Sequence, residues 1–198
     1  MRFSSSVFPR FGWLSPVYGL IAMAVFCGSA QAACGDDVDG VRVPCACGDV
    51  VVSDVRLADE DPVVRERCSS DGLLVRAAND AASIRVDLDG NAIVGLGGGT
   101  GIRVLRGGRD GAVIVGGTAD RPGQVAGFRN GVRASGTRAV AEIRNLNVTG
   151  NTAEGIVVRG DETSLVNVVA DKNGRDGLRV SRGSHRRAKD GAEAEVEK

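Results

Sequence analysis

The sequence predicts an all-β solenoid of about five stacked coils. The main observation is a short motif that occurs five times: a glycine, a branched apolar residue, a variable residue and a second apolar residue. Its glycines are Gly72, Gly101, Gly131, Gly155 and Gly177, so the intervals are 29 (72 to 101), 30 (101 to 131), 24 (131 to 155) and 22 (155 to 177) residues. Strand-like repeats of about 20 to 30 residues are typical of solenoids. The composition agrees, because 29 glycines and only 4% aromatic residues favour short strands joined by tight turns.

Within the repeated strand, side chains alternate between the inside and the outside of the solenoid. Two inward columns are entirely apolar, which predicts a continuous core. The first is Leu73, Ile102, Val132, Ile156 and Leu178, and the second is Val75, Val104, Ala134, Val158 and Val180. The outward positions are mixed in character. They are Leu74, Arg103, Arg133, Val157 and Arg179, followed by Arg76, Leu105, Ser135, Arg159 and Ser181.

The first element in chain order, residues 1–32, is predicted to be a signal peptide. Arg2 and Arg10 precede an apolar run, and small residues at 30–32 offer a cleavage site. The alternative, a stable membrane span, needs about 20 apolar residues, more than the run at 17–27 supplies. We therefore expect a secreted or periplasmic protein. Without Arg2 and Arg10, the 25 basic residues become 23 against 25 acidic ones, which gives no electrostatic case for nucleic acid.

Residues 33–70 are expected to form an N-terminal cap that carries four cysteines. Cys34, Cys45, Cys47 and Cys68 remain after cleavage, and an even number in an exported chain suggests two disulfides. Of three possible pairings we favour Cys34–Cys45 with Cys47–Cys68, since adjacent loops then close without crossing. The spacing of Cys45 and Cys47 does not suit a zinc site, and no metal is expected. A short strand or two at 48–57 and a helical turn starting at Pro62 are further expectations.

Residues 71–182 are expected to form the coils, and the last two full coils match most closely. Asn145 aligns with Asn167 and Asn151 with Asn173, in each case 22 residues apart (167 − 145 and 173 − 151). Because asparagine tolerates left-handed backbone and can bond to its copy in the next coil, we interpret these residues as structural ladders.

Residues 183–198 are predicted to be a charged, disordered tail. The last coil, at 177–181, has no evident cap in the sequence, which leads to the hypothesis of self-association at that edge.

Several of these segments together resemble a known family. They are Cys47-Gly48-Asp49, Cys68 shortly before Asp71-Gly72-Leu73, residues 86–95, and the later repeat Asn-x5-Asn-x3-Gly-(Ile/Leu). They look like exported bacterial right-handed parallel β-helix proteins of the pectate-lyase-like superfamily, over residues 47–181. The resemblance implies a right-handed parallel β-helix with a disulfide-bearing N-terminal cap. It is unspecific for activity, since this superfamily includes lyases, hydrolases, epimerases and adhesins.

The resemblance also suggests one catalytic alternative, a lyase acting on a uronate polysaccharide. Such lyases use acidic residues to hold a cation and Arg or Lys as the base, and calcium would be required only in this case. The candidate residues are Asp171, Lys172, Arg175 and Arg179, which follow one another in and after a turn. Asp87 and Asp89 lack an identifiable opposing carboxylate, as a hydrolase would need. The Asp-Asp and Gly-His-Gly patterns of polygalacturonases are absent, as is the Asp-Pro-His-Asp pattern of alginate epimerases.

The leading interpretation is therefore a non-catalytic exported scaffold. Arg103, Arg133 and Arg179 share an outward position in three copies of the motif, and a row of guanidinium groups suits an anionic polysaccharide. Phe128 is the only aromatic residue after Ala32, so a sugar-stacking platform is not expected. No cofactor is expected.

Overall fold

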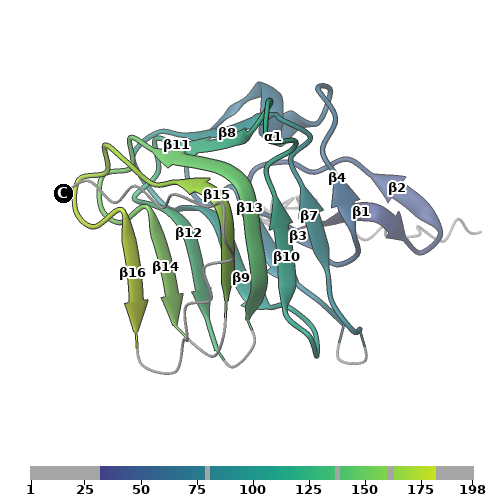
Figure 1. Ribbon diagram of the computed structural model, residues 1–198. Coiled ribbons are helices and arrows are strands. Elements are labelled where there is room, and N and C mark those ends of the chain that lie inside the picture. The colour runs from purple at the N-terminus through teal and green to yellow at the C-terminus, as the bar shows by residue number, and fades with distance from the viewer. Residues whose placement is uncertain (1–31, 79–80, 137–138, 160–162, 182–198) are drawn as a thin grey trace, which may run out of the picture. The chain divides into compact units, whose positions relative to one another are not determined.

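The computed structural model of the protein describes residues 32–78, 81–136, 139–159 and 163–181. They form a parallel β-solenoid of about five turns (Figure 1). Residues 1–31 of the predicted signal peptide and the whole predicted charged tail lie outside these ranges. No helix within the described part of the chain has the length and apolar character needed to cross a membrane.

One sheet contains the repeated motif and is called the motif sheet below. Its strands follow the spatial order β16-β14-β12-β9-β6-β3-β1-β2. Every neighbouring pair is parallel except β1 with β2. In chain order they are β1 (Ala33–Val38), β2 (Val41–Val43), β3 (Asp49–Val51), β6 (Leu73–Arg76), β9 (Thr100–Arg106), β12 (Asn130–Ser135), β14 (Ile156–Arg159) and β16 (Leu178–Ser181).

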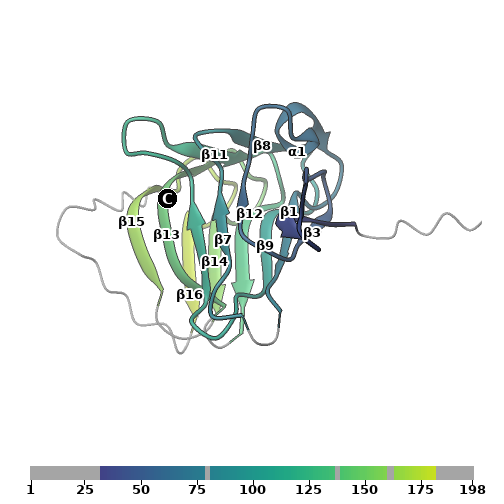
Figure 2. The same ribbon diagram turned by 90° about the vertical axis from the view of Figure 1, so that its right-hand side faces the viewer.

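The second sheet closes the other sides of each coil. Its spatial order is β4-β7-β10-β13-β11-β8-β5, with β15 also paired to β13. The strands are β4 (Val55–Arg56), β5 (Arg67–Cys68), β7 (Arg85–Asp87), β8 (Ala92–Gly95), β10 (Ala112–Val115), β11 (Gly123–Ala126), β13 (Val140–Thr149) and β15 (Ser164–Val169). The first half of β13 pairs with β10 and the second half with β11, so the sheet turns a corner there. Accordingly, β8 and β11 run across the top of the upright strands (Figure 1, Figure 2).

The two inward columns predicted from the motif are confirmed by the strand register. Leu73 pairs with Ile102, Ile102 with Val132, Val132 with Ile156, and Ile156 with Leu178. The first four residues of this column are fully buried. Val75, Val104, Ala134 and Val158 are likewise buried, so stacked apolar side chains fill the interior without interruption.

The outward columns differ from the expectation at two places. Arg76 pairs with Arg106, because a register shift follows Val75, so Leu105 does not occupy the predicted position above Arg76. In the other outward column Leu74 and Val157 are only 3% and 2% exposed. Val157 is flanked in register by Arg133 and Arg179, whose aliphatic stems can cover it while their charged ends stay in water.

The prediction of a disulfide-bearing N-terminal cap is confirmed, with Cys34 bonded to Cys45 and Cys47 to Cys68. The helical turn expected at Pro62 is observed as α1 (Pro62–Arg65). β1 and β2 form an antiparallel hairpin at the edge of the motif sheet, with both Asp39 and Gly40 at positive φ in its turn. Parallel stacking begins at β1, inside the segment assigned to the cap, since β1 pairs in parallel with β3 and β3 in parallel with β6.

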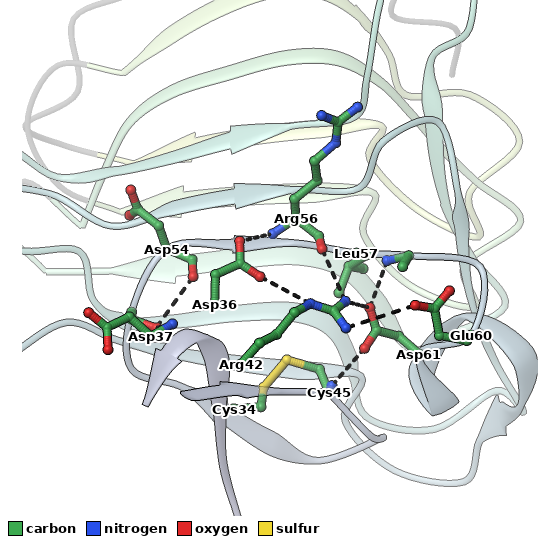
Figure 3. A network of polar contacts seen from close by, with 12 residues as sticks. Cys34, Asp36, Asp37, Arg42, Cys45, Asp54, Arg56, Leu57, Glu60 and Asp61 are labelled. Atoms are coloured by element: carbon green, nitrogen blue, oxygen red, sulfur yellow. Dashed lines mark hydrogen bonds and ion pairs between the residues drawn. A yellow bond between two sulfur atoms is a disulfide. The ribbon is translucent and has the colours of Figure 1, made fainter. Parts of the chain in front are cut away.

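Asp61 is the charged side chain that organises this cap, and it is fully buried. Its carboxylate accepts hydrogen bonds from the backbone N–H groups of Ala58 (2.7 Å) and Cys45 (3.1 Å) and from the Arg42 guanidinium (2.9 Å). Arg42 also lies 3.4 Å from Asp36, so it bridges two carboxylates beside the Cys34–Cys45 disulfide (Figure 3). A buried carboxylate with three donors avoids most of the cost of an unpaired charge.

Both asparagine ladders occur as predicted. Asn167 donates to Asn145 at 3.0 Å, and Asn151 donates to Asn173 at 2.9 Å. Asn145 and Asn167 have φ values of 51° and 50°, in the left-handed region that asparagine tolerates. Asn145 sits inside β13 where the second sheet turns, so the ladder forms the corner of successive coils.

Candidate functional site

The outer face of the motif sheet brings the predicted arginine row together. Arg103 on β9 pairs in register with Arg133 on β12, so these two neighbouring strands present guanidinium groups side by side. Arg179 on β16 belongs to the same column, separated from Arg133 by Val157 on β14. With neighbouring strands about 4.8 Å apart, the row runs parallel to the solenoid axis.

The three arginines differ in their acidic partners. Arg103 lies 3.7 Å from Asp71, and Arg179 lies 3.3 Å from Glu154. Arg133 has no side-chain hydrogen bond or ion pair to any described residue. Among the described residues the row therefore carries more positive than negative charge, and its middle guanidinium has no described acidic partner that an external anion would have to displace.

The lyase candidates fall into two separate contacts. Lys172 lies 3.7 Å from Asp171 and is 83% exposed. Arg175 and Arg179 both approach Glu154, at 3.8 and 3.3 Å. Glu154 was not among the predicted residues, although it directly precedes one of the motif glycines. No recorded contact joins the Lys172 pair to the Glu154 group.

A scan against protein-family models finds no model that matches the chain, and searches of curated proteins and of solved structures also find no match.

The second face holds a groove that the sequence did not predict. Its volume is about 490 Å³, and it lies over β7, β10 and β13 of the second sheet. Six charged side chains line it: Arg56, Arg85, Asp87, Asp89, Glu142 and Arg144. They form three ion pairs, Arg56–Asp89 at 2.7 Å, Arg85–Asp87 at 2.8 Å and Arg144–Glu142 at 3.5 Å. The sequence did not reveal the partners of Asp87 and Asp89. Asp87 pairs with Arg85, two residues earlier on the same strand, and Asp89 pairs with Arg56 on β4.

The ion pair between Arg56 and Asp89 shifts the pKa of both side chains. The hydrogen bond from Arg56, together with its positive charge, lowers the pKa of Asp89 below its ordinary value. The same contact raises the pKa of Arg56. Asp89 therefore remains ionised at any pH where an ordinary aspartate would be ionised.

Metal and aromatic chemistry find little support in the described residues. Among these residues, no three His, Cys, Asp or Glu side chains gather closely enough to hold a metal ion. The calcium expected for a lyase thus has no ready-made carboxylate cluster in that part of the chain. Phe128 is fully buried, so it offers no ring for stacking on a sugar.

Proposed function

We propose that the protein is an exported, non-catalytic β-helix that binds an anionic polysaccharide along the outer face of the motif sheet. The observation that carries the proposal is the register column of Arg103, Arg133 and Arg179, in which Arg133 lacks any acidic partner among the described residues. A guanidinium group binds carboxylate or sulfate with two parallel hydrogen bonds. A row of them at regular spacing suits a polymer that carries repeated negative charges.

Export is part of the same proposal. The two disulfides favour an oxidising compartment, either the periplasm or the cell exterior. The predicted signal peptide at 1–32 supports that location. Membership of the pectate-lyase-like superfamily rests on the sequence resemblance, and the parallel β-solenoid is compatible with it.

Binding is tested with the mature protein, polygalacturonate and alginate, by biolayer interferometry at several salt concentrations. Because the contacts are ionic, affinity should fall roughly tenfold or more between about 50 and 200 mM salt. Changing Arg103, Arg133 and Arg179 together to Gln should remove most of the binding. The matched control changes the exposed Arg65, Arg67 and Arg121 to Gln, which removes the same charge away from the motif sheet. Equal losses in the two triple variants would contradict a defined site.

The lyase alternative is tested on the same material. Protein, pectate or alginate, and calcium are incubated, and the absorbance of unsaturated product is followed. We expect no turnover, because Lys172 and Arg175 contact different carboxylates. If the unmodified protein does turn over the substrate and the double variant Lys172→Ala/Arg175→Ala does not, the protein is a lyase and the non-catalytic proposal is wrong.

A further inference from the structure

The groove on the second sheet differs in charge from the arginine row. It contains three guanidinium groups and three carboxylates, so its formal charge is zero. Each guanidinium is within 3.5 Å of a carboxylate of the same groove. An anionic polymer therefore gains little from this surface, since every positive group it approaches is accompanied by a negative one.

The order of the charges reverses across the groove. Strand β7 carries Arg85 and then Asp87, whereas β13 carries Glu142 and then Arg144. The register places Arg85, Val113 and Glu142 in one row, and Asp87, Val115 and Arg144 in the next. Each row thus has one guanidinium and one carboxylate at its two ends, two strand spacings or about 10 Å apart.

The floor between the charges is aliphatic. Val115 lies on β10 between the two charged strands and is only 2% exposed, while Val166 lines the neighbouring part of the groove. Val115 is therefore covered by its neighbours and closes the bottom of the groove, and a ligand above it meets the charged groups on both sides. The volume of about 490 Å³ falls in the range of small-ligand sites.

The walls are held in place before any ligand arrives. The ion pairs restrain the charged side chains, and Asn145 at the edge donates to the Gly117 carbonyl at 2.7 Å. Asn145 in turn accepts from Asn167, which continues the ladder. Groups fixed in this way lose less conformational entropy on binding.

Hydroxyl groups match these walls best. A carboxylate only accepts hydrogen bonds and a guanidinium only donates them, whereas a hydroxyl does both. Two adjacent sugar hydroxyls can donate to Asp87 or Glu142 and accept from Arg85 or Arg144 without adding charge. We propose that this groove binds a neutral oligosaccharide, which lies between the ion pairs and bonds to those on both sides.

This site goes beyond the proposed function and does not depend on it. The groove and the arginine row lie on different sheets and are expected to bind sugars of different charge. The salt dependence of affinity distinguishes the two sites. Binding of a neutral sugar in the groove should change little between about 50 and 500 mM salt, whereas binding of an anionic polymer to the arginine row should weaken.

The experiment is an NMR titration of the ¹⁵N-labelled mature protein with neutral hexasaccharides: β-1,4-glucan, β-1,4-mannan, β-1,4-xylan and α-1,4-glucan, each to about 10 mM. At least one should shift the amide signals of Asp87, Val115 and Arg144, with no shift at Arg133. The double variant Asp87→Asn/Arg144→Gln should lower the affinity for that sugar by about tenfold or more. The matched control, Arg65→Gln/Glu66→Gln, removes one exposed charge of each sign elsewhere and should leave the affinity unchanged.

Three outcomes would overturn the proposal. One is the absence of shifts with every neutral sugar. Another is displacement of a bound neutral sugar by oligogalacturonate that shifts the same groove amides, which would make the groove an anion site. The last is a change in sedimentation of the Asp87→Asn/Arg144→Gln variant at unchanged sugar affinity, which would make this face a contact between copies of the chain. Loss of sugar binding in a folded variant, judged by its dispersed amide spectrum, supports the proposal.

Discussion

The N-terminal cap and the repeated coils are stabilised in different ways. The cap, from β1 to β5, contains both disulfides and the buried Asp61 network. The coils from β6 onward contain no cysteine and rely on apolar columns and asparagine ladders. In the cap, β2 pairs only with β1, and antiparallel to it, so this edge lacks the coil-on-coil stacking that most other strands have on both sides.

The difference shows how a solenoid begins. A coil between two others gains burial from both neighbours, and its stability is spread over many equivalent contacts. The first strands lack one neighbour, so a few specific cross-links replace the missing stacking. Removing one of these cross-links should therefore cost at least as much stability as truncating a fully buried side chain in the coils.

Removal of the disulfides should have the largest effect. They close loops with sequence separations of 11 and 21 residues. In the chain-entropy model each disulfide contributes about 3 kcal/mol to the free energy of unfolding, and the one that closes the longer loop contributes about 0.5 kcal/mol more than the other. Urea unfolding of the two double Cys→Ala variants measures both values. A variant without Cys47 and Cys68 that keeps full stability would break the comparison.

Asp61→Asn should come next, at about 3 kcal/mol, because it disturbs a buried carboxylate with three donors. The matched control is Glu60→Gln. Glu60 is 4.0 Å from the same guanidinium but is 68% exposed, so its change should cost less than about 0.5 kcal/mol. Equal thermal shifts in the two variants would mean that burial does not set the importance of this network.

Ile156→Ala tests the coils at a fully buried position and should cost about 3 kcal/mol, including the cavity it leaves. Leu178 follows it in the same column but is half-buried, so Leu178→Ala should cost about 1 kcal/mol. Denaturant unfolding of the two variants measures both losses, and unchanged m-values would show that the midpoints report stability alone. A larger loss at Leu178 would show that the last described coil is more critical than its burial indicates.

The asparagine ladders should differ from each other by a smaller amount. Asn151 is 2% exposed and accepts from the Phe128 backbone N–H at 3.0 Å, so Asn151→Ala should cost about 2 kcal/mol. Asn167 is exposed, and glycine tolerates its positive φ, so Asn167→Gly should cost about 0.5 kcal/mol. Hydrogen exchange at Phe128 should accelerate only in the first variant.

The smallest effect concerns pH. Asp89 has a lowered pKa in the folded protein because of its hydrogen bond with Arg56. A lowered folded pKa means that the stabilisation is present above the unfolded value of about 3.9 and is lost as pH falls through the folded value. A ¹³C NMR titration of the Asp89 carboxyl should give a midpoint below the ordinary value, and Arg56→Gln should raise it. Identical midpoints would remove Arg56 as the cause.

Much of the fold could be predicted because strand alternation has a fixed period of two. Leu73 and Ile156 could be assigned to one inward column without any knowledge of the coils between them. The β1–β2 hairpin was missed, although Asp39-Gly40 is a strong signal for a two-residue hairpin turn. The buried Asp61 was missed as well, because nothing near it in the sequence indicates three donors.

The groove could not be predicted for a physical reason. Arg56 and Asp89 are 33 residues apart, and the paired rows of Arg85 and Glu142 belong to coils of different length. Insertions in the turns change the distance along the chain but leave the spatial register intact, so sequence spacing does not reveal which outward side chains meet.

The sequence by itself therefore determined the inward columns and the asparagine ladders, since each depends on a local pattern that repeats, whereas it only favoured one of three disulfide pairings. Only the tertiary structure decided which charges share an outer face. It placed Arg103 beside Arg133 in one column and set the opposed pairs of Arg85–Asp87 and Glu142–Arg144 around Val115. Outward positions are free of packing constraints, so their partners are fixed only when the coils stack.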